Sequence, residues 1–385
     1  MNIVHVVESL ALGGLERVVV SLVGIQVRRG HRVQVVCLFN EGTLAIDARA
    51  AGAEVFACGK VAGLDLGAAR KMRCVIKAFR ADVVHTHNPV AHYYAAMATL
   101  GLGSRMLLNT RHGMGSFPFS RRRETLYRAA LVVSDVAVCV CDAAMERFVS
   151  HRIIPRAKAL TVRNGTNVSA FAERNAAARG RLLGACEVSG DPFVFGTVGR
   201  LSAAKDQAGL LTAMRHLVDV GADVLLVIVG DGEMRHTLHE QVGTLQLEAR
   251  VRFLGARSDI PALLAGFDAF VLSSVTEGYS LALVEACAAA LPCVVTDVGG
   301  NAEIINDGIS GLLVPSGDPT RLATAMGKLC DSSSARDAMG NAARDWALKN
   351  GTLNAMYERY QAIYERRGLA VPPSQPVRAT KSIHE

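Results

Sequence analysis

The stretch DAFVLSSVTEGYSLALVEA, residues 268–286, has the form of a buried strand that leads directly into a helix. Its apolar start predicts the strand, and its end predicts the helix. Two carboxylates mark the junction: Glu277 lies in the turn before a glycine, and Glu285 follows in the helix with seven residues between them. In open parallel sheets, ligands bind at the carboxyl ends of the strands, where loops and helix N-termini gather. We therefore expect both carboxylates to lie near a ligand.

The same alternation of strand and helix runs through the rest of the chain. Short β-branched runs such as IVHVVES, residues 3–9, alternate with longer helical patterns, and the alternation restarts at FVFGTVGR, residues 193–200. Near-continuous apolar strands separated by amphipathic helices indicate parallel sheets that are covered on both faces. The sequence therefore predicts an α/β fold with two successive doubly wound, Rossmann-like domains.

The domain boundaries follow from length and local composition. A chain of 385 residues exceeds the usual length of one domain. We expect an N-terminal domain over 1–165, a strand-poor linker over 166–191 and a C-terminal domain over 192–350. A helix over 351–370 is expected to return to the N-terminal domain, and the polar, Pro-rich tail over 371–385 is expected to be disordered.

Cysteine usage and hydropathy favour a cytoplasmic protein. The nine cysteines are odd in number and scattered, which is typical of reduced thiols rather than of a disulfide framework. The opening MNIVHVVESL has a strand pattern without a basic leader, so no secretory signal is expected. No uninterrupted apolar run has the length needed to span a bilayer.

Charge is distributed unevenly along the chain. Residues 1–190 contain 25 Lys and Arg against 13 Asp and Glu, a formal charge of +12, whereas residues 191–385 contain 17 against 22, a charge of −5. A basic half suggests contact with something anionic. Nucleic acid is disfavoured, because only one Trp is present and no aromatic residues interleave the arginines. An anionic membrane surface fits better, and a solvated basic surface without a partner remains the alternative.

Several glycine turns follow predicted strands. GRLSAAKD, residues 199–206, places Arg200 and Lys205 beside Gly199, a combination suited to a diphosphate, although a surface Arg and Lys are also common. GDGE (230–233) and GGLER (13–17) are similar turns, but the G-x-G-x-x-G dinucleotide fingerprint is absent. RHG (111–113) places His112 at a strand end, where it can face a cleft. His5, His85 and His87 lie within strands, which favours a structural role for them.

The ordered set of these motifs resembles the family 4 retaining glycosyltransferases of the GT-B fold, the group 1 glycosyltransferases. The resemblance runs from residue 13 to residue 314. The motifs that carry it, in chain order, are GGLER, RHG, RNG (163–165), GRLSAAKD, GDGE, FLG (253–255), TEGYSLALVEA (276–286) and DVGGNAEIINDGISGLLV (297–314). The chain departs from the family at NGTN, residues 164–167, where Asn167 stands in place of a common Asp.

The resemblance implies roles for individual residues. Glu285 would bind the ribose hydroxyls of a nucleotide sugar, and Glu277 would lie near the transferred sugar. Arg200 and Lys205 would stabilise the diphosphate leaving group, and His112 would contact the donor sugar across the cleft between the two domains. The implied catalytic residues are His112, Arg200, Lys205 and Glu277, and the implied donor-binding residues are Gly14, Gly199, Gly232, Leu254, Gly278, Tyr279, Ser280, Leu281 and Glu285. No metal site and no cofactor besides the donor substrate are implied.

The resemblance also implies a reaction: transfer of a hexose-type sugar, with retention and without metal, to a saccharide or polyprenyl-diphosphate-linked glycan. The implied donor is a UDP-sugar in preference to a GDP-sugar. The setting would be bacterial exopolysaccharide, capsule or lipopolysaccharide assembly, in a cytoplasmic protein that associates peripherally with the membrane. The basic stretch SRRRETLYR, residues 120–128, lies soon after His112 and could contact anionic lipid, with Phe117 and Phe119 inserted beside it.

Other functions remain open at this stage. A nucleotide-sugar epimerase of the same fold would act on the donor alone. A non-catalytic nucleotide-sugar-binding protein would not need the residues that stabilise a leaving group. A phosphorylase would require a pyridoxal phosphate site and a much longer chain, neither of which is evident. A nucleic-acid binder is the least favoured alternative.

Overall fold

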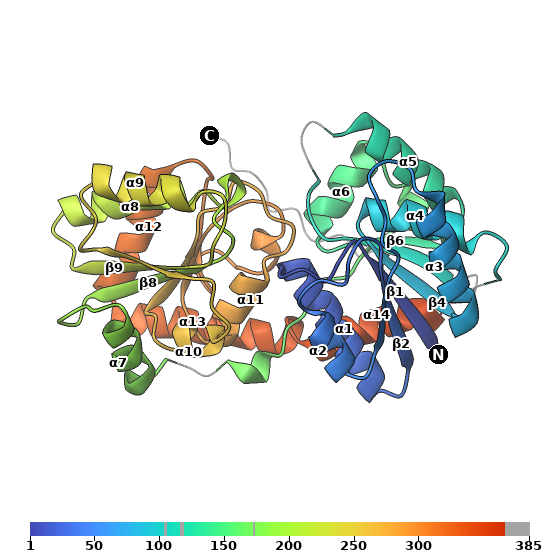
Figure 1. Cartoon of the computed structure of the whole chain (residues 1–385). Helices are drawn as coiled ribbons and strands as arrows, with labels where there is room; N and C mark the ends of the chain where they lie inside the picture. Colours follow the sequence, from blue (N-terminus) through green and yellow to red (C-terminus); the bar gives the residue numbers. More distant parts are fainter. Residues whose placement is uncertain (104–105, 116–118, 172–173, 366–385) are drawn as a thin grey trace. The chain divides into compact units, whose positions relative to one another are not determined.

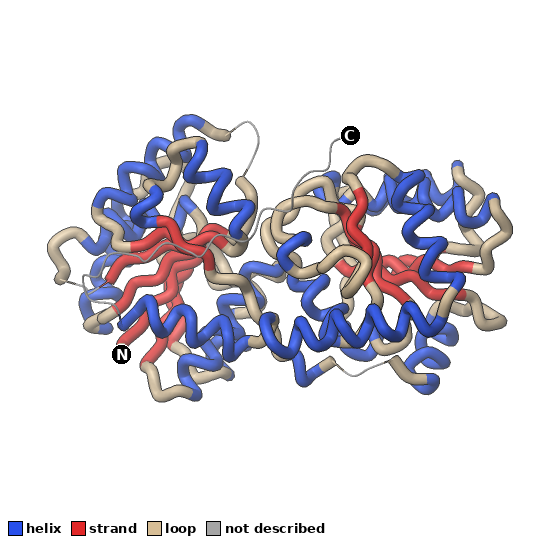
Figure 2. The backbone as a smooth tube through the Cα atoms, turned by 180° about the vertical axis from the view of Figure 1, so that it is seen from behind, coloured by secondary structure: helices blue, strands red, loops and turns tan. Residues whose placement is uncertain are grey.

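The structure is a computed structural model that describes residues 1–385 except 104–105, 116–118, 172–173 and 366–385 (Figure 1). Contacts divide the chain into two compact units. Of the described residues, the first contains those within 1–162 together with 358–365, and the second contains those within 163–357. Each unit has one parallel sheet with helices on both of its faces (Figure 2).

The described part of the first unit has a seven-stranded sheet in the order β3-β2-β1-β4-β5-β6-β7. The strands are β1 (Asn2–Val7), β2 (Arg32–Cys37), β3 (Glu54–Ala57), β4 (Val83–His87), β5 (Met106–Arg111), β6 (Val136–Cys139) and β7 (Ala159–Thr161). The helices are α1 (Gly14–Arg28), α2 (Ala45–Ala50), α3 (Leu66–Phe79), α4 (Pro89–Thr99), α5 (Arg121–Val132) and α6 (Asp142–Ser150), with a short 3₁₀ turn, η1 (Arg156–Lys158).

The described part of the second unit has a six-stranded sheet in the order β10-β9-β8-β11-β12-β13. The strands are β8 (Phe193–Val198), β9 (Val224–Val229), β10 (Val251–Gly255), β11 (Ala269–Leu272), β12 (Cys293–Thr296) and β13 (Leu312–Val314). The helices are α7 (Ala176–Ala185), α8 (Gln207–Asp219), α9 (Arg235–Thr244), α10 (Ile260–Leu264), α11 (Leu281–Ala288), α12 (Pro319–Asp331) and α13 (Ser333–Asn350), with 3₁₀ turns η2 (Val168–Ala170), η3 (Ala203–Lys205) and η4 (Asn301–Glu303).

Both faces of the central strands are buried, which explains their continuous apolar sequences. In β1, Val4 and Val6 pack into a cluster with α3 and α4, which contribute Met72 and Tyr94. Val7 of the same strand joins a different cluster with residues of α1. Because successive side chains of a strand point to opposite faces, a doubly covered sheet needs apolar residues at both parities.

Helix α14 (Leu353–Glu365) ends the described chain, and its last two turns belong to the first unit. Tyr360 and Tyr364 are buried there. The Tyr360 hydroxyl lies 3.0 Å from Thr110 Oγ1, and the Tyr364 hydroxyl lies 2.8 Å from His85 Nδ1. The tail expected over 371–385, and the part of the expected helix beyond 365, lie outside the described residues.

The segment expected as a linker, 166–191, differs from a plain connector. It contains α7, whose Ala178 and Leu182 are buried, and Asn175 caps this helix by accepting from the Ala178 amide at 2.9 Å. A Cβ on Gly266 would lie 3.0 Å from Leu182, so α7 packs closely on the second unit. This apolar contact is the physical reason that the segment is part of that unit.

Among the described residues, no helix combines the length and the apolar character required to cross a bilayer.

Gly196 in β8 tests the packing of the second unit. A Cβ there would lie 2.0 Å from the ring of the fully buried Phe267, so we expect Gly196→Ala to lower the free energy of unfolding by about 1–3 kcal/mol. Urea unfolding followed by the fluorescence of Trp346, the single tryptophan, reports this unit. The control is Gly184→Ala at an exposed position of α7, where a Cβ meets nothing within 4 Å. This substitution should stabilise the helix by about 0.5–1 kcal/mol. An unchanged midpoint for Gly196→Ala would contradict the packing described.

Candidate functional site

The order of strands in the second sheet creates a switch point between β8 and β11. From β8 the chain proceeds through β9 to β10 on one side, and it then crosses to β11 on the other side. The loops that leave β8 and β11 therefore run in opposite directions, and in doubly wound sheets ligands bind at the carboxyl edge where such loops diverge. Lys205 follows β8 and Glu277 follows β11, so the sequence-predicted residues lie at this switch point.

Lys205 and Glu277 are in direct contact. Lys205 Nζ pairs with Glu277 Oε1, and the Ser274 hydroxyl donates to the same carboxylate oxygen at 2.8 Å. Glu277 is only 8% exposed, and the Lys205 side chain is mostly buried. An ionised carboxylate so nearly removed from water requires a cation and hydrogen-bond donors. The contact therefore joins the two loops of the switch point through charge.

The backbone holds Lys205 in place. Asp206 adopts a left-handed conformation, with φ of 46°, and its side chain caps α8 by accepting from the Gly209 amide at 3.0 Å. The Ser273 hydroxyl lies 2.9 Å from the carbonyl oxygens of both Lys205 and Asp206. The loop after β11 is thus hydrogen-bonded to the turn that carries the lysine. Ser273, Ser274 and Asp206 were not predicted, because serines beside a strand end and an Asp before a helix carry no distinctive sequence signal.

Arg200 differs from Lys205 in its surroundings. Its backbone carbonyl accepts from Gln207 Nε2 at 2.9 Å, while its side chain is exposed. No ion pair of its guanidinium is recorded among the described residues. A cation at the switch point that is not already neutralised by a carboxylate is available to an anionic ligand.

Two glycines of the turn after β9 permit a close approach to the turn after β8. A Cβ on Gly230 would lie 1.9 Å from the Gly199 carbonyl oxygen, and one on Gly232 would lie 2.3 Å from the Leu201 carbonyl oxygen. The Leu201 amide donates to the Asp231 carbonyl at 3.0 Å. Gly232 was predicted to bind the donor, and the structure gives it this additional packing role.

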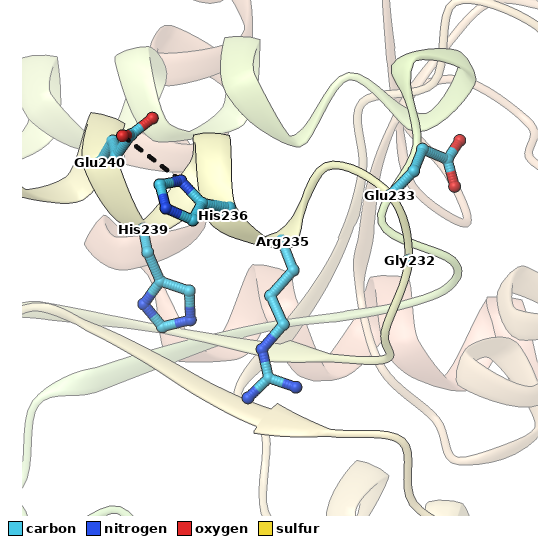
Figure 3. Close-up of a pocket in the computed structure, with 6 residues that line it drawn as sticks. All are labelled: Gly232, Glu233, Arg235, His236, His239 and Glu240. Atoms are coloured by element: carbon cyan, nitrogen blue, oxygen red, sulfur yellow. Dashed lines mark ion pairs between the residues drawn. The ribbon is translucent and has the colours of Figure 1, made fainter.

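A pocket of about 680 Å³ opens beside the start of α9 (Figure 3). It is lined by Gly232, Glu233, Arg235, His236, His239 and Glu240. Figure 3 shows Arg235 and His239 extending to the same side of the helix, and the His239 ring packs 4.1 Å from the Phe253 ring. Leu254, the next residue, lies at a β-bulge where β10 shifts register against β9. The volume is in the usual range for small-molecule sites.

The N-terminus of α11 carries the remaining predicted donor-binding residues. Ser280 is the N-cap, and its hydroxyl accepts from the Leu283 amide at 3.3 Å. Tyr279 and Ser280 are buried, and Leu281 begins the helix. The first-turn amides of a helix lack intrahelical partners and attract anions. Glu285, four residues after Leu281, lies on the same face of the helix.

The turn after β12 fixes the backbone beside Glu277. Gly299 has φ of 55°, and a Cβ on it would lie 1.8 Å from the Glu277 carbonyl oxygen. The Gly300 amide donates to the Gly278 carbonyl at 2.9 Å. The predicted second-unit residues therefore come from neighbouring loops at one edge of the sheet.

His112 and Gly14 belong to the first unit. His112 follows β5, its amide donates to Asn88 Oδ1 at 3.2 Å, and its Nε2 lies 2.9 Å from His87 Nδ1. Burial lowers the pKa of His112 to about 3, so the ring is neutral at pH 7. Gly14 is the first residue of α1, and a Cβ there would meet nothing within 4 Å.

Three histidines of the first unit, His5, His85 and His87, bring ring nitrogens within 4.8 Å of one another. Zinc bound at 2.0–2.1 Å in a tetrahedral site needs nitrogens about 3.4 Å apart. The nitrogens of these rings already have hydrogen-bond partners: Gln26, His87 and His112 along one branch, and Thr110 and Tyr364 along the other. The group is therefore a hydrogen-bonded core in this structure, and a metal would have to replace several of these bonds.

Comparisons with known proteins give a consistent result. Residues 12–170 match the Glycosyltransferase Family 4 description, and residues 186–346 match Glycosyl transferases group 1. The UDP-Gal:alpha-D-GlcNAc-diphosphoundecaprenol alpha-1,3-galactosyltransferase of Escherichia coli is 28% identical over 268 residues, which is 67% of this chain and 68% of that protein. The N-acetyl-alpha-D-glucosaminyl L-malate synthase of Bacillus anthracis is 28% identical over 308 residues, which is 78% of each chain.

A solved structure gives the fold. Anabaena Alr3699/HepE in complex with UDP-glucose matches with a TM-score of 0.83 over 94% of this chain and 99% of that chain, at 22% sequence identity. The two parallel-sheet α/β units of this chain and this match confirm the predicted GT-B architecture.

Acid should destabilise the first unit selectively. Burial lowers the pKa of His5 to about 4 and of His92 and His112 to about 3, whereas an unfolded histidine titrates near 6.5. The unfolded state therefore binds more protons below about pH 6.5, and stability falls as pH drops, by about 1.4 kcal/mol per histidine and pH unit.

Urea unfolding at pH 7 and pH 5 checks this expectation. The Trp346 signal is the internal control, because the histidines of the second unit, His216, His236 and His239, are half-buried or exposed. Circular dichroism follows both units, and the transition that is absent from the Trp346 signal belongs to the first unit. The midpoint of that transition should move to a lower urea concentration at pH 5. The same midpoint for the first unit at pH 7 and pH 5 would contradict the conclusion that these histidines are buried and neutral.

Proposed function

Because this chain belongs to the family 4 glycosyltransferases of group 1, we propose that it transfers a hexose from a UDP-sugar to a saccharide or polyprenyl-diphosphate-linked glycan, with retention of configuration. It is a glycosyltransferase that uses a nucleotide-sugar donor. The observation that carries the finer proposal is the contact between Lys205 and Glu277 at the switch point. The name of the Escherichia coli relative, which contains UDP-Gal and diphosphoundecaprenol, supports this donor and acceptor class.

The cations at the switch point suit a diphosphate leaving group. Lys205 has three N–H donors, so it can keep its bond to Glu277 while another N–H turns to a phosphate oxygen. Arg200 adds an exposed guanidinium from the same turn. Donors that are already in place when charge develops on the leaving group stabilise the transition state more than the ground state.

The surroundings of Glu277 favour a role other than covalent nucleophile. Its Oε1 already accepts from Lys205 and from the Ser274 hydroxyl at 2.8 Å. A carboxylate oxygen neutralised in this way is a weak nucleophile. This supports a reaction in which the leaving phosphate accepts the proton of the attacking hydroxyl on the same face of the sugar, which gives retention. His112 is assigned to the donor sugar and Glu285 to the ribose.

The first test removes each cation of the GRLSAAKD turn. We expect Lys205→Ala and Arg200→Ala to lower turnover by about 10²–10³ while the protein stays folded. Arg250→Ala is the matched control, because Arg250 pairs with Asp223 at the opposite, amino end of the strands and should keep wild-type turnover. Turnover is measured with saturating UDP-sugar and an acceptor, and incubation with the donor alone identifies an epimerase. Near wild-type rates for either cation variant would overturn the diphosphate assignment.

Turnover should also be independent of divalent metal. Lys205 and Arg200 lie at the switch point and can themselves supply the positive charge that a leaving diphosphate requires. We expect the rate to be unchanged after dialysis against EDTA. A loss of activity that magnesium or manganese restores would contradict this mechanism.

We further propose that the first unit docks on anionic membrane through the start of α5. Arg121 and Arg122 are exposed there. Glu124 does not simply neutralise this run, since it is held by buried Arg111 through two bonds of 2.7 and 3.0 Å, with Arg123 3.8 Å away. Each basic residue near an anionic leaflet contributes about 1 kcal/mol.

The apolar part of this docking surface differs from the sequence-based expectation. Phe119 is half-buried and packs against Phe148 at 5.9 Å, so it is not free to insert, and Phe117 lies outside the described residues. Exposed apolar side chains lie instead at Val61 and Leu64 in the loop before α3, and at Leu66, the first residue of that helix, with exposed fractions of 66, 70 and 57%.

Vesicle co-sedimentation tests the docking. Wild-type protein should pellet with anionic vesicles but not with neutral ones, and added salt should release it. Arg121→Ala/Arg122→Ala should lose most of this binding. Arg32→Ala/Arg156→Ala removes the same charge from exposed positions at the amino edge of the same sheet and should bind normally. Equal pelleting of both double variants would contradict the proposed surface.

A further inference from the structure

A buried chain of hydrogen bonds crosses the first sheet and ends at His112. Gln26 Oε1 lies 2.8 Å from His5 Nε2, His5 Nδ1 lies 3.0 Å from His87 Nε2, and His87 Nδ1 lies 2.9 Å from His112 Nε2. Gln26 comes from α1, and the three rings come from β1, from β4 and from the residue after β5. Gln26, His5 and His87 are buried. We refer to these four side chains as the histidine chain.

Each ring of the histidine chain is neutral. Burial lowers the pKa of His5 to about 4 and of His112 to about 3, and it holds the pKa of His87 well below its ordinary value. A neutral imidazole has one N–H donor and one lone-pair acceptor. The direction of one bond in the chain therefore fixes the direction of the next.

Gln26 sets that direction. Its Oε1 can only accept, and its Nε2 lies 3.3 Å from the Tyr364 hydroxyl, to which it donates. His5 must therefore donate from Nε2 and accept at Nδ1. By the same logic His87 donates from Nε2 and accepts at Nδ1, and His112 donates from Nε2.

This arrangement leaves a lone pair on His112 Nδ1. That atom is buried and has no hydrogen-bond partner among the described residues. The opposite direction would require the Gln26 amide to turn over, and it would leave a buried N–H at His112 Nδ1 without an acceptor. An orphaned N–H is the rarer defect in native proteins.

We propose that Gln26, His5 and His87 are positioning residues that hold His112 in the Nε2–H tautomer, so that its Nδ1 accepts a hydrogen bond from a hydroxyl of the transferred sugar. The sugar as partner rests on the function proposed above, whereas the tautomer rests on the histidine chain alone. The consequence is specificity: the donor sugar must present a hydroxyl proton to this nitrogen. A deoxy or fluoro group at the same position cannot donate and leaves the lone pair unpaired.

Nuclear magnetic resonance of the full-length protein, labelled with ¹⁵N at histidine, tests the tautomer without any ligand. Long-range ¹H–¹⁵N correlations distinguish the two neutral tautomers, and His112→Asn identifies the His112 signals. At pH 7 we expect His112 to be neutral, with its proton on Nε2. A proton on Nδ1, a charged ring, or signals of metal-bound His5 and His87 would overturn the proposal.

Gln26→Leu tests the positioning role. Loss of the terminal acceptor lets the chain reverse, so His112 should populate both tautomers. Gln34→Leu is the control, because Gln34 is another buried glutamine of the same unit whose amide contacts Glu54 at 3.1 Å instead. A Gln26→Leu spectrum with the wild-type tautomer of His112 would overturn the positioning role. If Gln26→Leu does not fold, the wild-type spectrum still decides the tautomer.

Kinetics test the sugar as the partner of His112. With each candidate hexose donor, Gln26→Leu should lower kcat/KM by about 3- to 10-fold, the equivalent of one hydrogen bond, and Gln34→Leu should not. In a series of monodeoxy donors, one should lose kcat/KM in the wild type and show no further loss in Gln26→Leu. A wild type that has the expected tautomer but loses no activity with any deoxy donor would overturn the sugar as partner. If the wild type turns over no nucleotide sugar at all, the function proposed above fails as well.

Discussion

The contact between Lys205 and Glu277 joins the two loops on which the second unit's site depends. The loop after β8 and the loop after β11 leave the switch point in opposite directions, and each carries one partner. Bonds from Ser273 to the backbone of the lysine turn, and from Ser274 to the carboxylate, extend the same connection. Because Glu277 is nearly buried, its charge requires these partners, and the arrangement of the two loops at the switch point follows from that requirement. The glycines at 230, 232 and 299 then allow the neighbouring turns to approach closely.

The first unit uses uncharged polar groups in the corresponding place. Its switch point lies between β1 and β4, where His5 and His87 meet, and His112 follows the next strand. Burial keeps these rings neutral, so their hydrogen bonds have a direction rather than a charge. In the reaction proposed above, the paired charges of the second unit suit a diphosphate, and the fixed lone pair of the first unit suits a hydroxyl.

Much of this could be predicted from the sequence, for identifiable physical reasons. Doubly covered strands need apolar residues at both parities, so the runs that form β1 and β11 were recognisable, and the carboxyl-edge rule indicated where Arg200, Lys205 and Glu277 would lie. The structure of the segment 166–191 was harder to predict. Only a few small apolar side chains of α7 are buried, so its sequence resembles that of a connector.

The remaining features depend on contacts between distant segments. The histidine chain joins residues that are between 21 and 82 positions apart in sequence. No local pattern indicates that a glutamine in α1 fixes the proton of a histidine after β5. Two further tertiary contacts could not be predicted from the basic run at 120–128. They are the buried ion pair of Glu124 with Arg111 and the packing of Phe119 on Phe148.

The most direct test of the central claim is nucleotide-sugar binding to the second unit, read as a shift in the urea unfolding of Trp346. A UDP-sugar present at about 100 times its dissociation constant should add roughly 2.7 kcal/mol to the free energy of unfolding. The account predicts that shift for wild-type protein and for Arg250→Ala, and a much smaller one at the same concentration for Lys205→Ala. Equal stabilisation of Lys205→Ala and wild type, or no stabilisation by any nucleotide sugar, would contradict a donor site at the β8–β11 switch point.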